Sequence, residues 1–177
     1  VARKAKAGQF VIIRIDEEGE RIPLTVADYD RQSGEITLVF QEVGKTTKQL
    51  GTMQVGDELA SFVGPLGRPT EIEKYGTVMC VGGGVGIAPI YPIARSLREA
   101  GNHVISIIGA RNVSLLFWED KMIEACDELT VCTDDGTYGR HALVTQPLQE
   151  VLQARKEVSR VWAIGPAVMM KFCARTT

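Results

Sequence analysis

The sequence lacks the features that mark membrane-spanning, secreted and nucleic-acid-binding proteins. No run of about 18 apolar residues is present, so no transmembrane helix is expected. The basic start at residues 1–8 is not followed by the apolar segment of a signal peptide. Twenty Lys and Arg against 22 Asp and Glu give a net charge of −2, which argues against nucleic acid or an anionic membrane as a partner.

The four cysteines also lack a metal-binding or disulfide pattern. Cys80, Cys126, Cys132 and Cys173 form no C-x-x-C pair, and their spacing fits neither a zinc site nor a disulfide framework. No metal site is therefore expected. Free thiols are typical of a reducing cytoplasm, and we expect Cys80, Cys126 and Cys132 to pack in the core of strands or helices.

The remaining composition is that of a globular protein with a core of its own. The chain has 177 residues, of which 45% are hydrophobic and 24% charged. Glycine accounts for 18 of the 177 residues, about one in ten. The usual share of glycine is about 7%. Much of this excess falls in one loop.

The first part of the sequence predicts a small antiparallel β-barrel. Short apolar runs alternate with turn segments such as residues 16–19 and 30–34, and this spacing is typical of small barrels. One or two helical turns are expected at residues 46–53. The expected strands are residues 10–15, 21–29, 35–40 and 58–63.

The second part of the sequence predicts a parallel sheet with helices on both faces. Two Pro and two Gly at residues 64–69 interrupt any regular element and indicate a domain boundary. Strand-like and helix-like segments alternate after it, and Ile90, Ile93, Ala94 and Leu97 have the spacing of one apolar helix face. The expected strands are 77–81, 103–108, 128–133 and 161–164, and the other expected helices are 115–126, 142–154 and one that begins at Ala167.

Four glycines cluster at residues 82–86, between a predicted strand and a predicted helix. Glycines there let the backbone approach a phosphate, and the helix N-terminus offers free N–H groups and the positive end of its dipole. A tight turn without a ligand needs fewer glycines, so we predict a nucleotide-binding loop. Its residues are Gly82, Gly83, Gly84, Gly86, Ala88 and Pro89.

This loop differs from the fingerprint of dinucleotide-binding dehydrogenases. With Gly82 and Gly84 as the first two glycines, Ile87 stands in place of the third. The acidic residue expected after the next strand is also absent, since Arg111 stands there. A plain dehydrogenase is therefore disfavoured.

Gly44, Lys45 and Thr46 look like the end of a P-loop, but the rest of that motif is absent. Val39 occupies the place of its first glycine, and no long helix follows. An NTPase is therefore disfavoured as well.

The order of these features resembles the ferredoxin–NADP reductase superfamily, and more closely its branch of electron-transfer subunits. That branch includes the electron-transfer subunit of dihydroorotate dehydrogenase and the small subunit of NADH-dependent ferredoxin–NADP oxidoreductase, also called sulfide dehydrogenase. The resemblance implies a small antiparallel FAD-binding β-barrel domain at residues 1–68, with its first strand missing. It implies a parallel-sheet NAD(P)-binding α/β domain at residues 69–177, with a truncated C-terminus.

The segment from Arg21 to Thr25 matches the Arg-x-Pro-Leu-Ser/Thr segment that holds FAD in this superfamily. The resemblance implies that Arg21 pairs with the flavin pyrophosphate, for which a guanidinium is suited, and that Pro23, Leu24 and Thr25 line the isoalloxazine. Thr25 is the expected catalytic residue, since its hydroxyl suits the flavin N5 region where a hydride arrives. The alternative is an arginine on an exposed strand with an edge proline.

Gly44, Thr46 and Thr47 match the superfamily's Gly-Lys-Gly-Thr segment, which opens a short helix at the FAD phosphates. Thr46 stands where the superfamily usually has glycine. The resemblance still implies that the three residues contact the cofactor.

For the nicotinamide nucleotide, the resemblance implies that the glycine loop lies under the pyrophosphate and Arg111 faces the adenosine. Asp134 and Asp135 match a segment whose carboxylate binds ribose hydroxyls. The alternatives are a solvated arginine and a plain surface loop. The segment beside the nicotinamide begins with Gly165 and Pro166 and ends with two methionines, of which at least one is expected to pack in the core.

The resemblance also implies partners. Members of the branch continue into a segment whose cysteines hold a 2Fe–2S cluster, which we expect only in a longer protein. The implied partner is a larger flavoprotein oxidoreductase subunit, either dihydroorotate-oxidising or glutamate-synthase-like, with ferredoxin as a further acceptor.

The function that the resemblance implies is an electron-transfer flavoprotein subunit, an NAD(P)H-dependent oxidoreductase that passes a hydride from NAD(P)H to FAD and electrons onward through the cluster to the partner. Two alternatives to it remain open from the sequence. One is a nucleotide-binding regulatory or assembly module without turnover, which would not use the segment from Arg21 to Thr25. The other is a flavin reductase that uses flavin as a substrate. The choice between NADH and NADPH and the oligomeric state also remain open.

Overall fold

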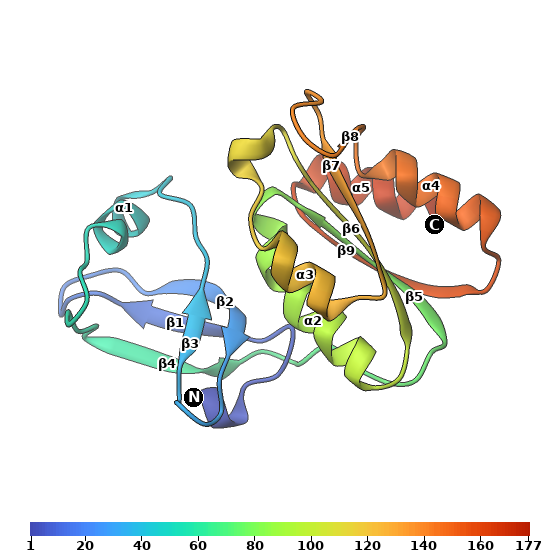
Figure 1. The fold of residues 1–177 in the computed structure, drawn as a ribbon. Helices are drawn as coiled ribbons and strands as arrows, with labels where there is room; N and C mark the ends of the chain where they lie inside the picture. The colour runs from blue at the N-terminus through green and yellow to red at the C-terminus, as the bar shows by residue number, and fades with distance from the viewer. The chain divides into compact units, whose positions relative to one another are not determined.

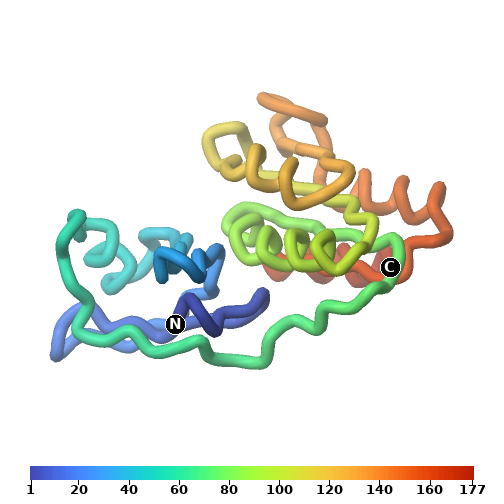
Figure 2. Tube along the Cα trace, turned by 60° about the horizontal axis from the view of Figure 1, so that its bottom comes forward, coloured from blue at the N-terminus to red at the C-terminus, as the bar shows by residue number.

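The computed structural model describes all of residues 1–177, which divide into two compact units, Val1–Thr70 and Glu71–Thr177 (Figure 1). Residues 67–76 join the last strand of the first unit to the first strand of the second without a helix or strand (Figure 2). None of the helices combines the length and the apolarity needed to cross a membrane.

The first unit is an antiparallel sheet with one short helix. Its strands run in the order β3-β2-β1-β4. Every second side chain of β1 is buried, so that Val11 and Ile13 form a core with Val26 of β2. The elements are the 3-10 turn η1 (Ala2–Lys4), β1 (Phe10–Arg14), β2 (Ile22–Tyr29), β3 (Ile36–Leu38), α1 (Lys45–Gly51) and β4 (Ser61–Leu66).

The expectation that Gly64 and Pro65 end the preceding strand is wrong. β4 runs through both residues to Leu66, which pairs with Phe10 of β1. β4 lies at the edge of the sheet, where a proline costs no ladder hydrogen bond on the outer side. Glycine is required at position 64 because a Cβ there would lie 2.7 Å from Cγ1 of Val11.

The second unit is a parallel five-stranded sheet in the order β8-β7-β6-β5-β9. The predicted alternation of strands and helices is confirmed, and the two-residue strand β8 is the one strand that the sequence did not predict. The elements are β5 (Thr77–Gly83), the 3-10 turn η2 (Gly84–Gly86), α2 (Ile87–Glu99), β6 (His103–Ala110), the 3-10 turn η3 (Val113–Leu115), α3 (Glu119–Ala125), β7 (Glu128–Thr133), β8 (Arg140–His141), α4 (Thr145–Ala154), β9 (Val158–Ile164) and α5 (Ala167–Thr176).

Helices cover both faces of this sheet, α2 and α3 on one and α4 and α5 on the other (Figure 1). The predicted apolar face of α2 is confirmed, since Ile90, Ile93, Ala94 and Leu97 are all at most 2% exposed. On the opposite face, Leu148 packs in a cluster with side chains from β5, β6 and α5. Burial on both faces explains the continuous apolar runs of β5 and β6.

Helix α3 begins later than residue 115, where the sequence predicted it. Trp118 has a φ of 59°, a left-handed conformation that interrupts the helical path just before Glu119. The helix therefore has only seven residues.

All four cysteines are unpaired and buried. This confirms the core placement expected for Cys80, Cys126 and Cys132. Burial raises the pKa of the Cys80 thiol, which therefore stays protonated and unreactive at neutral pH.

Candidate functional site

The candidate nucleotide-binding residues of the second unit all lie at the carboxyl ends of parallel strands or after them. In chain order β5 is followed by β6, β7 and β8 on one side, and β9 then returns to the other side of β5. The helices after β5 and β9, α2 and α5, leave toward opposite faces (Figure 1). Ligands of open α/β sheets bind at such a switch point, outside the carboxyl ends of the strands.

Three glycines of the predicted loop lie where a Cβ would clash with atoms packed around this switch point. A Cβ on Gly82 would lie 2.9 Å from Cγ2 of Ile90, so this glycine lets α2 approach the strand. A Cβ on Gly83 would clash with Sδ of Met169, and one on Gly86 would clash with the carbonyl oxygen of Ile164. The number of glycines is therefore not by itself a sign of a ligand.

Gly84 is different from the other three. Its φ is 55°, and a Cβ there would meet no atom within 4 Å. It begins the 3-10 turn η2, which leads into the 13-residue helix α2, and the N–H of Ile87 at the start of α2 donates to the carbonyls of Gly84 and Val85. The first turn of α2 contains Ala88, which is buried, and Pro89, which is half-buried. Among the four glycines of the loop, Gly84 alone has open space where a Cβ would lie, and this leaves room for a phosphate at the N-terminal end of the helix.

Arg111 and Asp134 lie side by side on the same edge of the sheet. The N–H of Asp134 donates to the carbonyl of Ala110 at 3.0 Å, and the N–H of Asp135 donates to that of Arg111 at 3.1 Å. Both Arg111 and Asp134 are exposed. The loops after β6 and β7 thus present a cation and an anion together.

The carboxylate of Asp135 is used within its own loop. Its Oδ1 accepts hydrogen bonds from N of Thr137 at 3.0 Å and from Oγ1 of Thr137 at 2.7 Å. These bonds hold the pKa of Asp135 below its usual range. Oγ1 of Thr137 also accepts from N of Val113 at 3.0 Å. Sequence reasoning missed Thr137, which ties the two loops together and leaves Asp134 as the carboxylate available to a ligand.

Gly165 and Pro166 follow β9 and lead into α5, with Pro166 exposed at the helix N-cap. A Cβ on Gly165 would lie 2.7 Å from Cε of Met169, which packs against the core. The core role expected for one of the two methionines is thus confirmed for Met169. Met170 is 40% exposed.

In the first unit, Arg21, Pro23 and Thr25 alternate along the chain and are all exposed. Side chains two apart share a face of a strand, so Pro23 and Thr25 share one face of β2, and Arg21 directly precedes the strand. Strand β3 pairs only with Val26–Tyr29 and does not cover this segment. The side chain of Leu24 packs against the core instead, so it does not belong to this exposed face.

The first turn of α1 is joined to the segment just before β2 by a side-chain hydrogen bond. Oγ1 of Thr46, which is 7% exposed, donates to Oε2 of Glu20 at 2.8 Å. The bond brings Arg21 and the first turn of α1 together. Gly44 is exposed and donates its N–H to Oγ1 of Thr47 at 2.9 Å, which fixes the start of the helix. Sequence reasoning missed Glu20, which has no motif to mark it.

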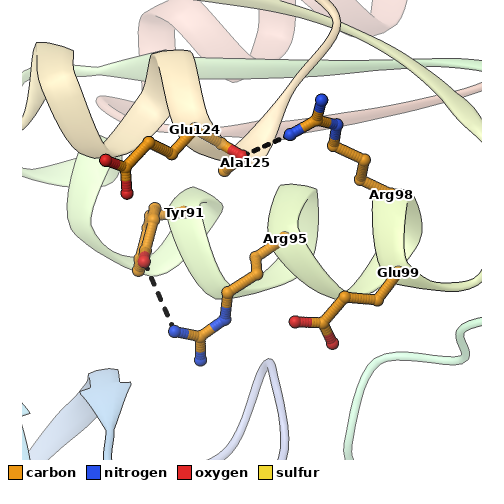
Figure 3. Close-up of a pocket in the computed structure, with 6 residues that line it drawn as sticks. All are labelled: Tyr91, Arg95, Arg98, Glu99, Glu124 and Ala125. Atoms are coloured by element: carbon orange, nitrogen blue, oxygen red, sulfur yellow. Dashed lines mark hydrogen bonds between the residues drawn. The ribbon is translucent and has the colours of Figure 1, made fainter.

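A hollow of about 390 Å³ lies apart from all of these residues, against α2 and α3 (Figure 3). Arg98 donates to the carbonyl of Glu124 at 2.6 Å, and Arg95 donates to the hydroxyl of Tyr91 at 3.3 Å. None of the predicted site residues lines this hollow, whose lining consists of Tyr91, Arg95, Arg98, Glu99, Glu124 and Ala125.

Comparison with known proteins finds close relatives over nearly the whole chain. The chain is 49% identical over 173 residues to a dihydroorotate dehydrogenase B (NAD(+)) electron transfer subunit homolog of Thermotoga maritima, covering 98% of this chain and 61% of that protein. It is 33% identical over 181 residues to the dihydroorotate dehydrogenase B (NAD(+)) electron transfer subunit of Bacillus caldolyticus, covering 98% and 68%. No family model matches the chain.

A solved structure of an NADH-dependent reduced ferredoxin-NADP oxidoreductase, from a study of flavin-based electron bifurcation, agrees with the fold. It has a TM-score of 0.91 and 44% identity, and the match covers 99% of this chain and 63% of that one. The predicted fold class, an antiparallel β unit followed by a parallel α/β unit, is confirmed. The chain belongs to the family of the dihydroorotate dehydrogenase B electron transfer subunits, within the ferredoxin–NADP reductase superfamily that the sequence motifs predicted.

Proposed function

We propose that the chain transfers electrons from a reduced nicotinamide nucleotide, bound by Glu71–Thr177, to FAD, bound by Val1–Thr70. The observation that carries the proposal is the open space at Gly84, at the switch point of the sheet and at the start of the turn η2 that leads into α2. A phosphate there would lie toward the positive end of the helix dipole.

The residues around Gly84 suit the rest of a dinucleotide. Asp134 offers a carboxylate for ribose hydroxyls, and Arg111 beside it offers a guanidinium for the adenosine side. Pro166 and Gly165 follow the strand on the other side of β5. They would contact the nicotinamide end of a nucleotide that crosses the switch point.

The exposed face of β2 and the first turn of α1 suit FAD. Arg21 would pair with the diphosphate, which would lie beside the segment that contains Gly44, Thr46 and Thr47. The hydroxyl of Thr25 lies on the same face of β2 as Pro23 and would hydrogen-bond the flavin ring. FAD held there would supply the redox chemistry, and the residues of this chain would bind it, orient it and exclude water.

The chain spans about three fifths of the length of the first relatives, 61% and 62%. The activity of a whole protein therefore extends the proposal: we infer an electron-transfer subunit that serves a larger oxidoreductase partner in the cytoplasm. No group of three or more His, Cys, Asp and Glu side chains is arranged to hold a metal ion. A 2Fe–2S cluster, if the longer protein has one, would take its ligands from outside these 177 residues.

The direct test is FAD retention. The purified chain is incubated with FAD, passed through a desalting column and examined by visible absorption, with lysozyme treated in parallel as a non-binding control. The proposal predicts flavin bands that coelute with the chain. A chain that remains colourless after this treatment would contradict it.

A further inference from the structure

Helix α1 is attached to the rest of its unit at three points on one side. Thr46 donates to Glu20 at 2.8 Å, and Nε2 of Gln49 donates to Oδ2 of Asp16 at 2.9 Å. Leu50 packs against the apolar core. Thr46, Gln49 and Leu50 are spaced three and four residues apart, so they share a face of the helix. The orientation of α1 is therefore set by the connection between β1 and β2.

The contact at Thr46 differs from the one at Gln49 in its surroundings. Thr46 is buried and its partner Glu20 is exposed, whereas Gln49 and its partner Asp16 are both exposed. Glu20 also directly precedes Arg21, so a shift of its carboxylate would move the guanidinium as well. The two contacts can therefore be compared within one protein. The bond to Glu20 lies next to Arg21 in the chain, whereas the bond to Asp16 lies five positions before Arg21.

We propose that Glu20 and Thr46 are a positioning pair that sets the placement of Arg21 relative to the first turn of α1 and thereby the affinity for the diphosphate of FAD. The inference rests on the proposed function, because it takes FAD as the ligand. Neither side chain needs to touch the cofactor. The hydrogen bond fixes the two phosphate-binding elements, which come from segments 26 positions apart.

The charge of Glu20 is not part of this role. A carboxylate beside Arg21 opposes the binding of a diphosphate, whereas the hydrogen bond requires only an acceptor. Glutamine keeps an acceptor oxygen and removes the charge. Glu20→Gln should therefore bind FAD at least as tightly as the unchanged chain.

The test compares FAD with riboflavin, which has the same ring system and no phosphate. Dissociation constants for both ligands are measured by flavin fluorescence, and the melting temperature is recorded for each variant. Thr46→Val and Glu20→Ala should each weaken FAD binding about three- to tenfold, the range for the loss of one hydrogen bond. Riboflavin binding should not change, and the double variant should be no weaker than either single one.

Two further variants serve as controls. Thr46→Ser retains the hydroxyl and should bind FAD like the unchanged chain. Gln49→Ala removes the other side-chain bond of α1 and should leave FAD affinity within about twofold, as expected for an exposed contact.

The inference is overturned if Thr46→Val binds FAD as tightly as the unchanged chain, or if FAD and riboflavin lose affinity equally. Equal losses would mean that the pair supports only the general structure of the unit. An unchanged chain that does not bind FAD would overturn the proposed function, and this inference with it.

Discussion

In Glu71–Thr177 the backbone topology brings the candidate residues together, whereas in Val1–Thr70 side-chain contacts of α1 do so. Parallel strands end at one edge of a sheet, so Gly84, Arg111 and Asp134 are neighbours wherever the fold forms. Arg21 and α1 are joined instead by the bond between Glu20 and Thr46. A substitution that disturbs the backbone should disrupt the first arrangement, whereas the loss of one side-chain group should disrupt the second.

The largest expected effect is on the backbone arrangement of the second unit. A methyl group on Gly86 would clash with the backbone of Ile164. Backbone atoms in a strand cannot move aside as the end of a flexible side chain can. Gly86→Ala should therefore lower the free energy of unfolding by about 2–3 kcal/mol. Both tryptophans, Trp118 and Trp162, lie in this unit, so urea unfolding followed by their fluorescence measures the loss.

Gly84→Ala is the matched control for that variant. It places the same methyl group in open space at a φ of 55°, for which the conformational cost is about 1 kcal/mol. Equal losses in the two variants would contradict the division of the loop into packing glycines and one open glycine.

The next effect falls on the first unit. Arg21→Ala removes an exposed guanidinium that makes no core contact, so the fold should persist. FAD affinity should fall about 10- to 100-fold, the range for a charge-assisted hydrogen bond. Equilibrium dialysis against FAD measures the change, with Arg31→Ala on the same unit as a control. Undiminished affinity in Arg21→Ala would count against the flavin site.

A smaller loss of ligand affinity is expected in the second unit, where the side chain of Thr137 also helps to hold the loops after β6 and β7. Thr137→Val removes the bonds of this hydroxyl to Asp135 and to the N–H of Val113. NADH affinity should fall about three- to tenfold, while Thr137→Ser should retain it. Isothermal titration of the three chains with NADH decides this, and equal affinities would show that topology alone suffices in this unit.

The smallest effect concerns the opposite edge of the same sheet. Hydrogen bonds from Arg155 at 2.6 and 2.8 Å and one with His103 at 2.9 Å hold the pKa of Glu128 below its usual range. A carboxyl group with a lowered folded-state pKa stabilises the protein fully at pH values above its unfolded-state pKa. This stabilisation is lost as the pH falls through the folded-state pKa. Because the pair is exposed, Arg155→Ala should cost only about 0.5 kcal/mol at pH near 6, and less at pH near 4. Urea unfolding at both pH values tests this, and a cost that grows on acidification would refute it.

Much of the fold could be predicted because it follows from local patterns. The alternation of strands and helices and the apolar face of α2 depend on residues a few positions apart. The passage of β4 through Pro65 could not be predicted, because it depends on β4 being an edge strand. The short α3 depends on the left-handed conformation of Trp118.

The candidate site divides in the same way. Gly84, Arg111 and Asp134 could be predicted, because their positions after strands are visible in the sequence. Glu20 and Thr137 could not, because each acts through a hydrogen bond to a residue 24 to 26 positions away, which no periodicity records. The side chain of Leu24 packs against the core because neighbouring residues of β2 face opposite sides.

The central claim is that a reduced nicotinamide nucleotide delivers electrons to FAD bound on this chain. The most direct measurement is an anaerobic titration of the FAD-loaded chain with NADH and, separately, with NADPH, followed by visible absorption. We expect the oxidised flavin bands to bleach in proportion to at least one of the two nucleotides added. Flavin bands that persist with an excess of either nucleotide would contradict the claim.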